Sequence, residues 1–75
     1  MDRAALDAAL IAAHADGDHA RLVALYTEAA DRAEAAGETD ASCFYLTQAY
    51  VFALASGAAE AGHLHARLLA RGREE

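Results

Sequence analysis

Proline, lysine and tryptophan are absent from this sequence of 75 residues, and cysteine occurs once. Without proline, no segment carries the residue that breaks a helix from within. A single cysteine cannot form an internal disulfide, which is typical of a reducing compartment, so we expect a cytoplasmic location. The first residues do not form a basic segment followed by an apolar core, and no secretory signal is predicted.

Positive charge is also scarce, since six arginines accompany twelve acidic residues and the formal net charge is −6. A chain of this sign has no electrostatic footprint for a phosphate backbone, so a nucleic acid partner is not expected. The uncharged run of residues 41–59 has the length of a membrane span. Its serines, threonine, glutamine and glycine argue against insertion, and no membrane partner is predicted.

Alanine dominates what is present, with 23 copies in the sequence. It has the highest helix propensity of all residues, and few β-branched residues accompany it. The composition therefore predicts an all-α fold, in a single domain over residues 1–75. Because alanine buries little area, the core of so short a chain is small, and self-association or docking on a partner is expected to add to it.

Glycines divide the chain into four predicted helices. Each helix is followed by a glycine that can adopt the left-handed conformation of a helix end, at Gly17, Gly37, Gly57 and Gly72. The predicted ranges are residues 2–15, 18–36, 40–56 and 58–71. Because the connections are short, neighbouring helices are antiparallel, and the chain forms two helical hairpins over about residues 2–36 and 40–72.

Side chains at the predicted helix starts are suited to capping. Asp2 is the predicted N-cap of the first helix, and Thr39 or Asp40 is the predicted N-cap of the third. Within the second helix, Glu28 and Arg32 have the spacing of an ion pair along one helix face. These local signals support the positions of the helices.

The third predicted helix contains both phenylalanines and two of the three tyrosines, in the segment CFYLTQAYVFALA of residues 43–55. At about 100° per residue it is apolar nearly all round, so it must be covered on several sides by other helices or by another molecule. One stripe consists of Phe44, Thr47, Gln48 and Val51. Its mixture of apolar and hydrogen-bonding groups suits a contact surface. Coverage by the chain's own helices fits the pattern equally well.

The two halves of the chain correspond at an offset of 40 residues, because Gly17 and Gly57 both follow an alanine-rich helix. The residues after the first turn are Asp18, Ala20, Leu22, Tyr26 and Ala29. Around the second turn, Leu46, Ala49, Tyr50 and Ala53 lie in the helix before the glycine, and Gly62 lies in the helix after it. In this spacing of glycine, small residues and tyrosine, the chain resembles the tetratricopeptide-repeat family.

The resemblance implies a right-handed stack of the two hairpins. Proteins of that family are mostly scaffolds that hold a peptide or a partner helix on a concave face lined by their first helices. On this sequence the resemblance places the following residues on that face: Phe44, Thr47, Gln48 and Val51, with Asp7, Ile11 and His14 beside them. We therefore predict a small non-enzymatic interaction module that binds a protein or peptide partner or forms a homodimer. The exposed end of the stack, on the fourth helix, is a further candidate for self-association.

Two arginines support an alternative function. Arg67 and Arg71 share one face of the fourth helix and could clamp a carboxylate or a phosphate. The protein would then be an accessory or regulatory subunit of a larger enzyme that binds a small anionic ligand. Favourable placement of cations at a helix C-terminus explains the same two residues without a ligand.

Residues with catalytic or metal-binding chemistry do not form a recognisable set. His63 and His65 diverge by about 200° on a helix and cannot share a metal ion, and His14 and His19 lack a third ligand. Cys43 lies in a first helical turn, where the helix dipole can activate a thiol, but its aromatic surroundings favour a small buried side chain. No metal, cofactor or catalytic residue is predicted, and no enzymatic activity.

Overall fold

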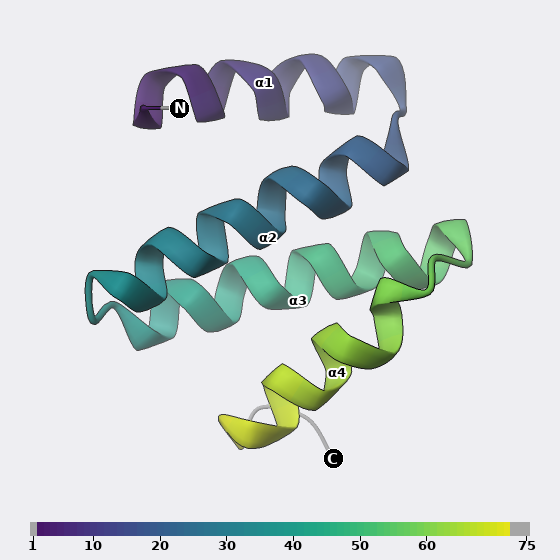
Figure 1. The fold of residues 1–75 in the computed structure, drawn as a ribbon. Coiled ribbons are helices and arrows are strands. Elements are labelled where there is room, and N and C mark those ends of the chain that lie inside the picture. The colour runs from purple at the N-terminus through teal and green to yellow at the C-terminus, as the bar shows by residue number, and fades with distance from the viewer. Residues whose placement is uncertain (1, 73–75) are drawn as a thin grey trace.

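The structure is a computed structural model that describes residues 2–72, and within this range it consists of helices and turns without a strand (Figure 1). The helices are α1 (Arg3–Asp16), α2 (His19–Ala35), α3 (Thr39–Ser56) and α4 (Glu60–Ala70). The predicted all-α class with four helices is confirmed. Each predicted boundary lies within two residues of the observed one.

Local hydrogen bonds explain where the first helices begin and end. The carboxylates of Asp2 and Asp18 each accept a hydrogen bond from the backbone amide three residues further on, at 2.7 and 3.1 Å. They satisfy amides that have no partner inside α1 and α2. Gly17 and Gly57 have φ angles of 63° and 66°, a conformation that costs glycine little and other residues more. The predicted cap at Asp2 is confirmed.

Two predictions at helix starts are wrong. The N-cap of α3 is Glu38 rather than Thr39 or Asp40, and its side chain makes no capping hydrogen bond. The connection after α2 is short, and α3 begins at Thr39, directly after Glu38. α4 begins at Glu60, two residues later than predicted. Its N-cap is Ala59, so no capping side chain marks the start of this helix, and the Ala58 amide bonds back to the Ala53 carbonyl of α3 at 2.8 Å.

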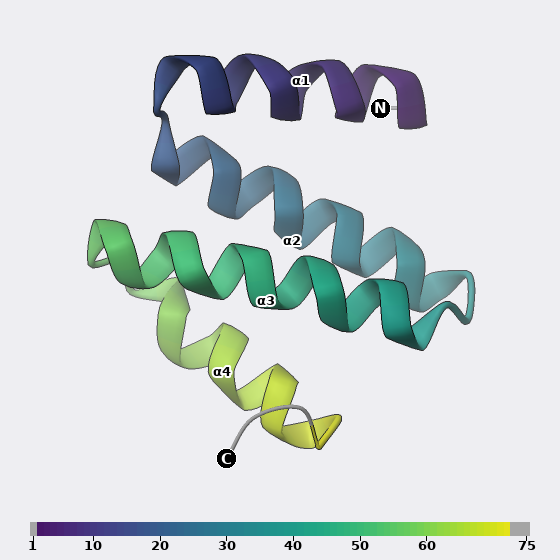
Figure 2. The same cartoon turned by 180° about the vertical axis from the view of Figure 1, so that it is seen from behind.

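The helices lie in chain order, so α1 packs on α2, α2 on α3 and α3 on α4 (Figures 1 and 2). α2 and α3 form the most extensive of these contacts. Ala30, Ala49 and Ala53 are completely buried, and their small side chains let the backbones approach closely. The Cα atoms extend over 31 × 29 × 13 Å, a flat arrangement in which each helix keeps one side open to solvent.

The core consists of two clusters of buried side chains that share three aromatic neighbours. The first cluster joins α2, α3 and α4 through Val23, Ala30, Leu46, Ala49, Ala53, Leu64 and Leu68. The second joins α1 to α2 through Leu6, Ala13, Leu22, Leu25 and Ala29. Tyr26, Tyr45 and Phe52 pack against both clusters. The arrangement is compatible with two helical hairpins, and the right-handed tetratricopeptide-like stack stays a prediction.

Candidate protein-binding surface

The aromatic helix α3 keeps one apolar side uncovered. Phe44 is 58% exposed and Val51 is 50% exposed, whereas Leu46 on the opposite side is 1% exposed. The other helices of the chain therefore enclose α3 only in part. Thr47 and Gln48, the polar members of the predicted stripe, are half-buried between the two large side chains.

The two polar side chains of the stripe differ in what they can offer a partner. The Thr47 hydroxyl donates a hydrogen bond to the Cys43 carbonyl of the preceding turn at 2.9 Å, so its proton is used within the helix. The Gln48 amide makes no hydrogen bond to any residue in the range 2–72. Gln48 is therefore the side chain of this stripe whose donors and acceptor are available to fix the register of a bound segment.

His14 has a structural role at the point where α1 meets α2 and α3. Its Nε2 atom is hydrogen-bonded to the Tyr26 hydroxyl at 2.9 Å, and its ring meets Phe52 edge-on with centroids 5.5 Å apart. Burial, followed by the neighbouring Tyr45, raises the pKa of Tyr26. The phenol is therefore protonated at neutral pH, and the hydrogen bond helps to hold α1 against the other helices.

The other two predicted residues of α1 are separated from each other. Ile11 is 71% exposed and lies on the solvent side of α1. Asp7 lines a cleft together with Tyr45 of α3. Of the three residues predicted on α1, His14 contacts α2 and α3, Asp7 lines a cleft and Ile11 faces solvent. Only Asp7 lines a cleft that it shares with a residue of α3.

This cleft has a volume of about 290 Å³ and lies between the N-terminal part of α1 and the C-terminal half of α2. Figure 1 shows that the two helices are farther apart there than at the turn that joins them. The lining residues come from α1, α2, α3 and the connection before α3: Arg3, Leu6, Asp7, Leu10, Ala29, Arg32, Ala33, Glu38, Ala41 and Tyr45. From α2, two small side chains, Ala29 and Ala33, line the cleft together with Arg32. The cleft therefore combines apolar walls with charges of both signs.

Phe44 connects the exposed stripe to the cleft. Its ring meets Tyr45 edge-on at 5.6 Å, and Tyr45 is a wall of the cleft. On its other flank Phe44 borders a shallower hollow that it shares with Asp40, Cys43 and Thr47. Phe44 thus forms a ridge between two hollows. We refer to Asp7, Tyr45, Phe44, Gln48 and Val51, with the cleft between them, as the α1–α3 surface.

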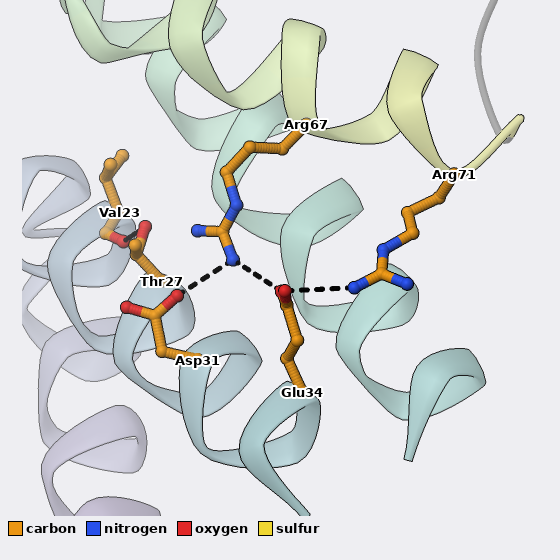
Figure 3. A network of polar contacts seen from close by, with 6 residues as sticks. All are labelled: Val23, Thr27, Asp31, Glu34, Arg67 and Arg71. Atoms are coloured by element: carbon orange, nitrogen blue, oxygen red, sulfur yellow. Dashed lines mark hydrogen bonds and ion pairs between the residues drawn. The ribbon is translucent and has the colours of Figure 1, made fainter. Parts of the chain in front are cut away.

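The two arginines of the alternative prediction bind carboxylates of α2 (Figure 3). Arg67 Nη2 lies 2.8 Å from Asp31 Oδ1 and 3.0 Å from Glu34 Oε2, and Arg71 Nη2 lies 2.9 Å from Glu34 Oε1. These ion pairs tie the last turns of α4 to the C-terminal half of α2. A small anion would have to displace both carboxylates, so anion binding stays a prediction that this geometry does not favour.

The link between α4 and α2 is expected to weaken in acid. The hydrogen bond from Arg67, followed by the charge of Arg71, lowers the pKa of Glu34 below its ordinary value of 4.5. A folded-state pKa below the unfolded-state value means that the stabilisation is present above about pH 4.5 and is lost as the pH falls through the folded-state pKa. We therefore expect the difference in Tm between the wild type and Glu34→Gln to shrink when the pH is lowered from about 7 to about 3.

A matched control for this experiment is Glu28→Gln. The Glu28–Arg32 pair, predicted from its spacing, is observed at 4.0 Å on the exposed face of α2. An exposed pair at this distance stabilises little, so its removal is expected to change Tm less than the removal of Glu34 does. A Tm difference for Glu34→Gln that is the same at both pH values would contradict the assigned role.

Cys43 and the histidines do not form a reactive centre. Cys43 is 3% exposed, which confirms its predicted burial. Across residues 2–72, no three side chains of His, Cys, Asp or Glu are grouped so that they could hold a metal ion. None of the helices in the described part of the chain has the length and apolar character needed to cross a membrane.

Comparison with known proteins does not help to interpret the α1–α3 surface. The chain matches no family model, no curated protein and no solved structure. The resemblance to tetratricopeptide repeats therefore stays a prediction from the sequence. The functional interpretation depends on the geometry of this surface.

Sequence reasoning missed most of the cleft. None of Tyr45, Leu6 and Leu10, which line the cleft, was predicted as a site residue. The signal that could have revealed the cleft is the pair Ala29 and Ala33, which repeat at one helical turn on the side of α2 that faces α1. Two such small residues in succession leave room beside them unless a large side chain of the facing helix fills it.

Proposed function

We propose that this protein is a non-enzymatic helical module that binds a protein or peptide partner through the α1–α3 surface. The supporting observation is the exposure of Phe44 and Val51 beside the cleft. Large apolar side chains at the centre of a contact, with polar groups at its edge, are the usual composition of a protein interface. Asp7, which lines the cleft, and Gln48 of the exposed stripe supply such polar groups.

The dimensions of the cleft indicate what part of a partner it would accept. About 290 Å³ is at the lower limit of small-molecule pockets, and it suits one or two side chains of a docked segment. Leu6, Leu10 and Tyr45 provide apolar walls, while Arg3 and Arg32 carry charge at the cleft. A partner segment with an apolar anchor residue and charged neighbours therefore fits this surface.

Aspartate substitutions on the ridge test this proposal. Immobilised protein is used to capture partners from a lysate of the source organism, and Phe44→Asp and Val51→Asp are compared with the wild type. Each is expected to reduce the recovered partner by at least about 10-fold, because a hot-spot side chain at the centre of an interface contributes about 2 kcal/mol or more. Phe44 and Val51 are half or more exposed, so their replacement leaves the core of the protein intact.

Ala24→Asp is the matched control, since it places the same charge at an exposed position of α2 away from the ridge. It is expected to capture the partner as the wild type does. Helix content and Tm of all three variants show whether they remain folded. Equal capture by the ridge variants and the wild type would mean that the α1–α3 surface is not the binding site.

A further inference from the structure

A second apolar area lies across α3 and α4. Leu54 is 57% exposed and Leu69 is 44% exposed. The rings of Tyr50 and His65 stack between the two helices, with centroids 5.3 Å apart and planes within 9°. Leu54 follows Tyr50 by one helical turn and Leu69 follows His65 by one turn. Each leucine therefore lies on the same side of its helix as the aromatic ring that precedes it. Because the helices are antiparallel, the leucines lie at opposite ends of the ring pair.

The outward side of α4 between these positions is open and smooth. Gly62, Ala66 and Ala70 repeat at one-turn intervals and are all exposed. A Cβ atom added at Gly62 would meet nothing within 4 Å, and this glycine is helical with no positive φ. Packing within the chain therefore does not require glycine at a position where it weakens the helix. A small residue there does allow another helix to approach closely.

The internal correspondence of the two halves shows what covers this side of the first hairpin. At the offset of 40 residues, Gly62, His65 and Leu69 correspond to Leu22, Leu25 and Ala29. The residues of α2 are 1%, 6% and 5% exposed, and they are covered by Leu6 and Ala13 of α1 and by aromatic side chains of α3. In α4, Tyr50 covers His65 in part, whereas Gly62 and Leu69 remain exposed within residues 2–72.

The distribution of charge selects a second copy of this chain as the occupant. Residues 2–38 contain eight carboxylates and three arginines, a net charge of −5, whereas residues 39–72 contain two of each and have no net charge. Arg67 and Arg71 point toward α2 and away from the open side. Two copies that meet through their second halves place neutral surfaces together and keep the acidic first halves far apart.

We propose that two copies of this protein pair about a twofold axis through α4 and the adjoining flank of α3, so that Leu69 and Leu54 of each copy are covered by the other. A head-to-tail contact of α1 on α4 would instead set the acidic half of one copy against its neighbour and would continue without closure. The dimer leaves the cleft on the other flank of α3 open. It is independent of the partner-binding function proposed above.

Charge substitutions with a matched control test the dimer. Sedimentation velocity over a range of concentrations is expected to show a dimer for the wild type. Leu69→Glu and Leu54→Glu are expected to raise the dissociation constant of the dimer by at least about 30-fold, because each substitution acts twice in a twofold contact. Ile11→Glu makes the same change on α1 at a residue that is 71% exposed, and it is expected to leave the dimer intact.

An engineered cysteine tests the twofold geometry. In a twofold contact centred on α4, Ala66 lies near its own copy, so Ala66→Cys is expected to form a disulfide-linked dimer on mild oxidation. Ala8→Cys on the outer side of α1 is the control, and Cys43 is buried. Three results would overturn the proposal: a monomeric wild type up to about 1 mM, dissociation by Ile11→Glu, or cross-linking through position 8 instead of 66.

The two proposals can fail separately. Leu69→Glu is expected to dissociate the dimer and still capture the partner, whereas Phe44→Asp is expected to remain dimeric and lose the partner. A Leu69→Glu variant that remains dimeric rejects the proposed contact through α4 and does not affect the proposal for the α1–α3 surface. A Phe44→Asp variant that retains the partner rejects the α1–α3 surface as the binding site and does not affect the proposed dimer.

Discussion

Replacement of Leu46 by alanine is expected to lower the free energy of unfolding by about 3 to 5 kcal/mol, the upper part of the range for a fully buried leucine. Leu46 is 1% exposed and belongs to the cluster in which α2, α3 and α4 meet. Its closest small neighbours in that cluster, Ala30, Ala49 and Ala53, have no flexible side chain that could move into the space. Loss of the transfer free energy is therefore joined by the cost of a cavity.

The effect is large compared with the total stability of such a chain. A domain of 75 residues has a free energy of unfolding of about 4 to 11 kcal/mol. Urea denaturation followed by circular dichroism is expected to show the unfolding transition of Leu46→Ala at a much lower urea concentration than that of the wild type. The control is Ile11→Ala, in which a residue 71% exposed loses a similar volume, and its expected change is within about 0.5 kcal/mol. Similar losses in both variants would show that Leu46 is not at the centre of the core.

Enlarging Ala49 to leucine is expected to destabilise the protein by about 3 kcal/mol. Ala49 is completely buried in the extensive contact between α2 and α3, where its single methyl group allows the two backbones to approach. Three additional carbon atoms must either push the helices apart or adopt a strained rotamer. Both outcomes reduce the burial of residues such as Ala30 and Ala53 around the contact.

The same substitution at Ala55 provides the control, because Ala55 lies two turns further along α3 on its exposed side. Leucine and alanine are both good helix formers, so Ala55→Leu is expected to change the stability by less than about 0.5 kcal/mol. Urea denaturation of the two variants measures the difference. If leucine at position 49 were tolerated as well as at position 55, the close approach of α2 and α3 would be incorrect.

The helices and their ends were largely predictable because their determinants are local. Gly17 and Gly57 end helices through their own backbone conformation, and Asp2 caps the residues that directly follow it. Helical spacing also placed Phe44 and Val51 on one side of α3, but it left open whether the other helices cover that side. The exposure of the two residues in the structure decides this. The start of α4 was missed because its N-cap, Ala59, has no side chain that could mark it by a capping hydrogen bond.

The cleft and the ion pairs of α4 could not be predicted from local patterns. The cleft depends on the angle between α1 and α2, which is set by contacts such as that of His14 with Tyr26, twelve residues later. Arg67 and Glu34 are 33 residues apart, and nothing in their own segments identifies them as partners. Both features arise from how separate helices are placed, so helical periodicity alone does not contain them.

The packing of each helix on its neighbours in the chain has a consequence for how the protein folds. Contacts between consecutive helices join residues that are close in sequence, so few long loops must close before native contacts form. Chains with such low contact order fold quickly, because each step loses little conformational entropy. During synthesis, the hairpin of α2 and α3 can form as soon as both helices have emerged from the ribosome, and α4 then adds to a surface that already exists.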